Sequence, residues 1–255
     1  MINKLLLGNN LDILKTFNND FIDCTITSPP YNKGENKNSG GILKGIKYDS
    51  SSDNIPEEEY QNQQVQLINE LYRITKPGGH LFYNHKIRYI DGKSIFPILW
   101  LNKTVWSIRQ EIIWDKKSAI NVRGWRFHVV DERIYWLYKP IDNNDRGKEL
   151  TQISAKNSSI WRFDPETKNQ SETEQKHPAP FPIELPKRIL LSLYNNDNKL
   201  ILDPYIGSGT TAIAAKMYNH NYIGIDISET YIRIAQKRLD NTKAENICTF
   251  SQMIE

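Results

Sequence analysis

The stretch Leu200-Ile-Leu-Asp-Pro-Tyr-Ile-Gly-Ser-Gly-Thr-Thr211 decides the fold, because it predicts a buried strand, a tight turn and the start of a helix. The spacing Gly207-x-Gly209-x-x-Ala212 fits the dinucleotide-binding fingerprint, in which small residues let the backbone approach a ligand closely. Asp226 ends the next predicted strand, where such proteins hold the ribose. This pattern predicts an α/β fold with a nucleotide-like ligand, and a NAD-dependent oxidoreductase is one candidate.

Asp203 points to a different ligand, because it stands at the end of the strand just before the glycine loop. The pyrophosphate of a dinucleotide would meet a fixed negative charge there, whereas a cationic ligand would be attracted. Two opposite charges ~4 Å apart are worth roughly 4 kcal/mol at an effective dielectric constant near 20. S-adenosylmethionine carries an ammonium, a sulfonium and a ribose but no phosphate. Asp203 would then face the methionine part and Asp226 the ribose. No Gly-Lys-Ser/Thr follows the glycines, which excludes a P-loop.

A second informative stretch, Thr27-Ser-Pro-Pro-Tyr31, follows the predicted strand Phe21–Ile26. Two prolines remove two backbone donors and hold φ near −65°, and the residue before each proline is pushed to extended geometry. The resulting stiff loop offers carbonyl acceptors between the Ser28 hydroxyl and the Tyr31 ring. It could therefore hold a flat group that carries an amine. The alternative is a rigid turn with a packing aromatic residue.

Predicted strands and helices alternate along the rest of the chain. Short apolar runs predict further strands at Lys4–Leu7, His80–Asn84, Trp106–Trp114, Arg133–Tyr138 and Asn221–Ile225. Amphipathic patterns and capping residues predict helices at Pro56–Tyr72, Pro186–Tyr194, Thr211–Tyr218 and Glu229–Leu239. This alternation predicts a mainly parallel, doubly wound sheet. Two polar stretches interrupt it: Asn32–Asp53 is interpreted as a mobile lid and Ile141–Pro182 as an inserted recognition segment or linker.

Composition restricts the class of protein. The 255 residues carry a net charge of +3, which permits a polyanionic partner without requiring one. Cys24 and Cys248, the only cysteines, make neither a disulfide framework nor a metal site. No apolar run reaches the eighteen residues of a membrane span, and no signal peptide is apparent. A cytoplasmic protein without a membrane partner is expected.

Three motifs together resemble those of the DNA amino-methyltransferases. Asp203-Pro-Tyr-Ile-Gly-Ser-Gly-Thr-Thr211 resembles their cofactor motif, D-P-F-x-G-S-G-T-T, and Ser28-Pro-Pro-Tyr31 resembles their catalytic motif, [D/N/S]-P-P-[Y/F/W]. His177-Pro-Ala-Pro-Phe-Pro182 is similar to a third segment, H-P-x-x-x-P. The catalytic motif precedes the cofactor motif, as in the circularly permuted β class. One departure is Gly8-Asn9-Asn10, because the family often has Gly-Asp there.

The resemblance covers nearly the whole chain and implies a fold and a set of site residues. It implies a Rossmann-like methyltransferase fold with a mostly parallel seven-stranded sheet and helices on both faces. A single domain, 1–255, would comprise a catalytic half (1–140), a variable target-recognition insert (141–176) and a cofactor half (177–255). The implied catalytic residues are Ser28, Pro29, Pro30 and Tyr31. The implied S-adenosylmethionine-binding residues are Asn9, Phe181, Asp203, Pro204, Tyr205, Gly207, Gly209, Thr210, Thr211 and Asp226, and no metal is expected.

The implied reaction moves a methyl group from S-adenosylmethionine to the exocyclic amine of a base flipped out of double-stranded DNA. The Pro29 carbonyl and the Ser28 hydroxyl would accept the amine hydrogens, and Tyr31 would stack on the base. Serine at position 28 favours N4 of cytosine, and N6 of adenine is the alternative. An RNA or protein amide methyltransferase and a non-catalytic DNA-binding module are more distant alternatives.

Target recognition is expected in three segments: Asn32–Lys47, Lys116–His128 and Ile141–Lys176, with Arg123, Arg126 and Arg162 as candidates. The resemblance also suggests a bacterial restriction-modification system. A homodimer and a separately acting restriction endonuclease are then candidate partners.

Overall fold

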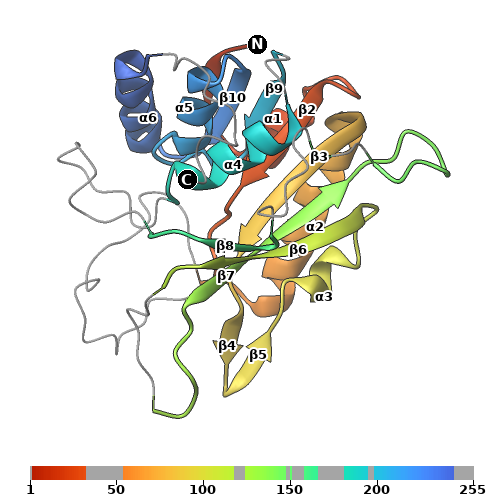
Figure 1. Cartoon of the computed structure of the whole chain (residues 1–255), viewed down its shortest axis with the longest axis vertical. Coiled ribbons are helices and arrows are strands. Elements are labelled where there is room, and N and C mark those ends of the chain that lie inside the picture. Colours follow the sequence, from red (N-terminus) through yellow and green to blue (C-terminus); the bar gives the residue numbers. More distant parts are fainter. Residues whose placement is uncertain are drawn as a thin grey trace.

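The centre of the fold is an eight-stranded sheet with the strand order β1-β10-β9-β2-β3-β7-β6-β8 (Figure 1). The computed structural model describes residues 2–32, 54–117, 124–147, 150, 158–165, 181–194 and 198–243. The strands are β1 (Lys4–Leu7), β2 (Ile22–Thr27), β3 (Thr75–His85), β6 (Ser107–Asp115), β7 (Asp131–Tyr138), β8 (Ile160–Arg162), β9 (Leu200–Asp203) and β10 (Asn221–Asp226). A separate hairpin pairs β4 (Arg88–Ile90) with β5 (Lys93–Ile95).

Only β7 runs against the others: it is antiparallel to β3 and β6, and the remaining neighbours in the large sheet are parallel. The predicted mostly parallel α/β fold is therefore confirmed. The sheet has one strand more than the seven expected, because β8 pairs with the edge of β6. β8 lies in the segment Ile141–Pro182, where no strand was predicted. Its three residues are too few to show an alternating pattern.

Helices cover both faces of the sheet, as predicted. On one face lie α1 (Asn10–Leu14), α2 (Glu57–Ile74) and α3 (Ile98–Leu101), and on the other α4 (Glu184–Leu193), α5 (Thr210–Met217) and α6 (Glu229–Asn241). Side chains of β3 alternate between the two cores: Leu81 and Tyr83 pack with α2, and Phe82 packs with α4 and α5. The short helices α1 and α3 and the β4–β5 hairpin were not predicted. None of the described helices is long and apolar enough to cross a membrane.

The two motif-bearing strands, β2 and β9, are neighbours at the point where the winding of the sheet reverses. From β2 the chain crosses through α2 to β3 on one side, and from β9 it crosses through α5 to β10 on the other. Thr25 of β2 pairs with Leu202 of β9, so the carboxyl ends of both strands lie side by side. Ligands of open α/β sheets bind in the crevice at such a reversal. The fold thus brings together two sequence motifs that are far apart in the chain.

Candidate active site

The Asp203 carboxylate joins the two motifs. One carboxylate oxygen, Oδ1, accepts hydrogen bonds from the Thr27 hydroxyl at 2.8 Å and from the Tyr205 backbone N–H at 3.0 Å. The other, Oδ2, accepts from the Thr211 hydroxyl at 2.7 Å. Thr27 directly precedes Ser28, and Thr211 lies in the first turn of α5, so this carboxylate fixes the Pro-Pro loop, where the catalytic residues are predicted, against the glycine loop. Asp203 is only 1% exposed, and burial raises its pKa to about 6 although all three hydrogen bonds act to lower it.

The glycine loop has a backbone conformation that its residue types permit. Gly209, the N-cap of α5, has φ +90°, and a Cβ there would lie 2.9 Å from the Ala235 Cβ. The Gly207 N–H donates to Asp226 Oδ2 at 2.9 Å, and Asp226 Oδ1 accepts from the Ser228 N–H at 2.9 Å. Asp226 therefore holds the glycine loop at the end of β10.

The charges around this loop fit S-adenosylmethionine. Carboxylates stand at the ends of both adjacent strands, Asp203 on β9 and Asp226 on β10. The nearby cation Arg238 donates to the Ser208 carbonyl and hydroxyl at 2.7 and 2.9 Å, so it holds the outside of the turn. A donor with positive charges and a ribose suits these two carboxylates better than a pyrophosphate does.

The turn after β1 lies against the glycine loop. Asn9, the predicted cofactor residue, is exposed and accepts the Asp12 N–H at 3.2 Å as the N-cap of α1. Its neighbour Asn10 donates to the Pro204 carbonyl at 3.2 Å. Sequence reasoning singled out Asn9 and missed the contact of Asn10, although both belong to the same motif. A cofactor contact of Asn9 stays a prediction.

Other predicted cofactor residues lie around the same loop. The Tyr205 hydroxyl is 3.4 Å from Gln64 Nε2 on α2, so its side chain is directed toward the α2 core. Thr210 is buried as the first residue of α5. Phe181 is partly buried against the α4 core, and His177–Pro180 lie outside the described residues.

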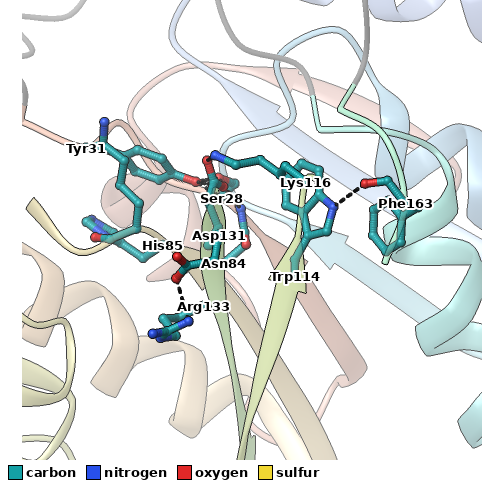
Figure 2. Close-up of polar contacts among 11 residues, drawn as sticks. Ser28, Tyr31, Asn84, His85, Trp114, Lys116, Asp131, Arg133 and Phe163 are labelled. Carbon is teal, nitrogen blue, oxygen red and sulfur yellow. Dashed lines mark hydrogen bonds and ion pairs between the residues drawn. The ribbon is translucent and has the colours of Figure 1, made fainter. Parts of the chain in front are cut away.

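A polar network surrounds the Pro-Pro loop, and it contains a carboxylate that the sequence did not reveal. Tyr31 Oη lies 2.8 Å from Ser28 Oγ and donates to Glu132 Oε2 at 3.0 Å. Asn84 Nδ2 donates to the same carboxylate oxygen and to Tyr31 Oη, both at 2.9 Å, and is 3.3 Å from Ser28 Oγ. Lys116 pairs with Glu132 Oε1 at 3.1 Å. Figure 2 shows the Lys116 and Tyr31 side chains both extending toward Ser28.

The position of Glu132 follows from the one reversed strand. Asn84 is the second-to-last residue of β3, and Glu132 is the second residue of β7, 48 residues later. Because β7 is antiparallel to β3, its beginning lies at the same edge of the sheet as the end of β3. Glu132 stood just before a predicted strand, but the direction of that strand was not readable from its residues. That direction was the missing signal.

The rest of the Pro-Pro loop is held by packing. The Tyr31 ring, 7% exposed, lies against His85 with ring centres 4.4 Å apart. Burial lowers the pKa of His85 to about 3, so this imidazole is neutral. The Pro30 carbonyl accepts from the Tyr60 hydroxyl at 2.8 Å. The Pro29 carbonyl, in contrast, accepts no hydrogen bond within the described part of the chain. Its role toward an amine, like the stacking of Tyr31 on a base, stays a prediction.

The expected recognition segments are only partly described. Arg126 lies over the Tyr89 ring at 4.3 Å, and Tyr89 also contacts Trp125. Arg162, on β8, donates to Asp115 Oδ2 at 2.8 Å. Arg123, most of Asn32–Lys47 and most of Ile141–Lys176 lie outside the described residues. In the described ranges no cluster of His, Cys, Asp or Glu could hold a metal ion.

Comparison with known proteins decides the family, since a family model described as DNA methylase, of the N6/N4 type, matches residues 22–237. The chain belongs to this DNA methylase family. It is 27% identical over 275 residues to the type II methyltransferase M.BglII of Bacillus subtilis, with 96% of this chain and 71% of that protein covered. Membership of this family excludes the NAD-dependent oxidoreductase that the glycine pattern had left open.

Solved structures show the same fold. The cytosine-N4-specific PvuII DNA methyltransferase superposes with a TM-score of 0.73 at 16% identity, covering 97% of this chain and 89% of that one. TTHA0409 of Thermus thermophilus, complexed with S-adenosyl-L-methionine, superposes with a TM-score of 0.65 at 21% identity, covering 93% and 95%. At these identities the similarity concerns the fold.

Proposed function

We propose that this DNA methylase transfers a methyl group from S-adenosylmethionine to the exocyclic N4 amine of a cytosine flipped out of double-stranded DNA. The observation that carries the proposal is the Asp203 junction, which joins Thr27 of the catalytic loop to Thr211 of the glycine loop. A methyl donor on one loop would face an amine on the other. When bound, S-adenosylmethionine supplies an electrophilic methyl group on a positively charged sulfur.

The protein's part in this reaction is to position the amine. The lone pair of a base amine is delocalised into the ring, so the amine is a weak nucleophile. Two acceptors, the Pro29 carbonyl and Ser28 Oγ, would bind its hydrogens and turn the lone pair toward the methyl group. No covalent enzyme intermediate is needed. Cys24, on the β2 strand that leads into this loop, is fully buried, and burial raises the pKa of its thiol.

The choice of cytosine rests on Ser28, because the resemblance to the amino-methyltransferases associates serine at this position of the catalytic motif mostly with N4 of cytosine and aspartate mostly with N6 of adenine. The fold shared with the cytosine-N4-specific PvuII enzyme is consistent with this choice. The second candidate target is N6 of adenine, since the same two acceptors could bind its amine. Relatives named as type II methyltransferases support a place in a restriction-modification system. The proposal includes two candidate partners: a restriction endonuclease that acts separately, and a second copy of this chain in a homodimer.

A surface formed by Tyr89, Trp125, Arg126 and Phe127 supports contact with nucleic acid. The Phe127 side chain is 98% exposed and that of Trp125 58%. The Arg126 guanidinium lies over the Tyr89 ring, so a positive charge sits among the aromatic rings. Aromatic side chains stack on unpaired bases, and arginine pairs with phosphates. This surface would contact the DNA around the flipped base.

Mass spectrometry of nucleosides from methylated DNA tests the proposal. Unmethylated duplex DNA incubated with the protein and S-adenosylmethionine should contain N4-methylcytosine. Ser28→Ala should slow the reaction about 10- to 100-fold, the value of a hydrogen bond to a group that becomes charged. Ser107→Ala, an exposed serine at the far end of β6, is the matched control and should leave the rate unchanged.

Two results would contradict the proposal in different ways. N6-methyladenine without N4-methylcytosine would refute the choice of base and leave the reaction class intact. Ser28→Ala methylating at the wild-type rate would refute the role of the catalytic loop.

A further inference from the structure

The hydroxyl groups of Ser28 and Tyr31 form a hydrogen-bond chain with a fixed direction. An ionised carboxylate has no proton, so in the 3.0 Å contact with Glu132 Oε2 the Tyr31 hydroxyl must be the donor. That hydroxyl has one proton. In the 2.8 Å contact between Ser28 Oγ and Tyr31 Oη, the proton must therefore come from Ser28. The chain runs from Ser28 to Tyr31 to Glu132, and it leaves Ser28 Oγ as an acceptor for further donors.

The carboxylate that sets this direction is held firmly. The Glu132 side chain is 13% exposed and pairs with Lys116 at 3.1 Å, across the β6–β7 ladder. Asn84 donates to it at 2.9 Å from β3. Asn84 on β3 and Lys116, the residue after β6, thus both hold Glu132 beside the catalytic loop. A simple ion pair between neighbouring strands would need only one of these donors.

The orientation of the Asn84 amide shows what this arrangement costs. Its Nδ2 is directed at three oxygens, whereas its Oδ1 is buried and has no hydrogen-bond partner among the described residues. An unsatisfied buried acceptor costs roughly 1–3 kcal/mol. The opposite orientation would place Oδ1 against the Glu132 carboxylate. The Asn84 amide is therefore oriented so that its Nδ2 donates to Glu132, while its Oδ1 is left without a hydrogen-bond partner among the described residues.

We propose that Glu132 is the final proton acceptor of the methyl transfer, acting on the substrate amine through Tyr31 and Ser28. This inference rests on the proposed function. As the bond between the amine nitrogen and the methyl carbon forms, the carbon–sulfur bond breaks and its electron pair stays on sulfur. The amine proton passes to Ser28 Oγ, the Ser28 proton to Tyr31 Oη, and the Tyr31 proton to the Glu132 carboxylate. The sulfonium charge and the carboxylate charge disappear together.

Glu132 would thus be a positioning residue, since it acts through two other side chains. It makes Ser28 Oγ an acceptor before the amine arrives, and it removes the positive charge that would otherwise build up on the methylated nitrogen. A purely structural role predicts something different. If Glu132 only joined β6 to β7 through Lys116, then removing the Tyr31 hydroxyl would have no effect on methyl transfer.

Single-turnover methylation of unmethylated duplex DNA by Glu132→Gln, Tyr31→Phe and the double variant tests the proposal. Each single variant should transfer the methyl group about 100-fold more slowly, within the range for general base catalysis. The double variant should be no slower than the slower single variant, because both changes interrupt one chain. Tyr31→Phe keeps the ring that packs on His85, so it separates the hydroxyl from any stacking role.

Binding measurements on the same variants show whether the defect lies in proton transfer. Calorimetry should give S-adenosylmethionine dissociation constants within about threefold of wild type, a difference of less than 1 kcal/mol. Fluorescence of 2-aminopurine at the target position should show normal base flipping. Glu111→Gln is the matched control: it removes another carboxylate of the β6–β7 ladder, the one that pairs with Arg133 at 3.2 Å, and it should act at the wild-type rate.

The pH profile gives a readout that a structural role would not change. With S-adenosylmethionine at saturating concentration, so that protonation of Asp203 does not limit donor binding, the wild-type single-turnover rate should fall as the pH is lowered, because a protonated Glu132 cannot accept another proton. Glu132→Gln should lose this acidic limb. A wild-type rate in Tyr31→Phe, or an intact acidic limb in Glu132→Gln, would overturn the proposal. If Glu132→Gln does not fold, Tyr31→Phe still decides the matter. Failure of the wild-type protein to methylate DNA would instead refute the proposed function.

Discussion

The glycine loop and the proposed catalytic site lie side by side but are built in different ways. The glycine loop belongs to one β–α–β unit, from β9 through α5 to β10, and it is defined by its backbone conformation and by backbone N–H groups that donate to the Asp226 carboxylate. The proposed catalytic site combines Ser28, Asn84, Lys116 and Glu132 from four segments of the chain. A site formed by contiguous backbone is sensitive to steric change, whereas a site formed by a side-chain network is sensitive to the loss of single polar atoms.

The largest effect is expected from Gly209→Val, which tests the backbone-defined site. A Cβ at this position would lie 2.9 Å from the Ala235 Cβ, and φ is +90°. Left-handed strain and overpacking together should reduce the free energy of unfolding by about 2–5 kcal/mol. S-adenosylmethionine binding, measured by calorimetry, should be lost. Chemical denaturation reports the stability.

Gly92→Ala is the matched control for that variant. Gly92 also has a positive φ, +76°, but nothing lies within 4 Å of its hypothetical Cβ. It should show the strain alone, about 1–2 kcal/mol, with donor binding unchanged. Donor binding at wild-type affinity in Gly209→Val would mean that the loop is not the cofactor site.

A smaller effect is expected from Asp203→Asn, which tests the carboxylate shared by both sites. The folded-state pKa of Asp203 is about 6, above the ordinary value of 3.8, so the folded protein binds the proton more tightly than the unfolded chain. The resulting stabilisation is present below pH 3.8 and is lost as the pH rises through about 6, with an upper value of about 3 kcal/mol. The asparagine variant should lack this pH dependence in chemical denaturation.

The raised pKa of Asp203 also predicts that binding of S-adenosylmethionine is coupled to the release of a proton. A cationic donor favours the ionised form of Asp203, so S-adenosylmethionine should release a proton on binding near pH 6. Calorimetry in two buffers with different ionisation enthalpies measures that proton. Asp203→Asn should bind the donor more weakly and release no proton. Asp20→Asn, which removes an exposed carboxylate paired with Lys139, should behave like wild type. Equal heats in both buffers for the wild-type protein would contradict this prediction.

The smallest effect on stability is expected from Phe127→Ala, outside both sites. The side chain is 98% exposed, so chemical denaturation should show no change. Affinity for duplex DNA, measured by fluorescence anisotropy, should fall about 10-fold if the ring stacks on a base. Val105→Ala removes another exposed apolar side chain, two residues before β6 begins and so at the opposite end of the strands, and it should leave DNA binding unchanged. Equal affinities for the two variants would remove Phe127 from the DNA-binding surface.

Local patterns were sufficient to predict most of the large sheet. The apolar runs at Lys4–Leu7 and Asn221–Ile225 became β1 and β10, and the helical pattern from Glu229 became α6. The Gly207–Gly209 turn was predictable because only certain residue types adopt its backbone conformation. The short elements α1, α3 and β8 were not predicted, because each has five residues or fewer and shows no periodicity in its apolar residues.

By itself the sequence determined the fold class, the two loops and their order, since these depend on residue types at fixed spacing. Only the tertiary structure decided that Asp203 accepts hydrogen bonds from Thr27 and Thr211, and that Glu132 lies beside Ser28. The physical reason is the direction of strands. A hydrophobic pattern is the same whether a strand runs parallel or antiparallel, and the reversal of β7 alone brings the Glu132 carboxylate to the catalytic edge.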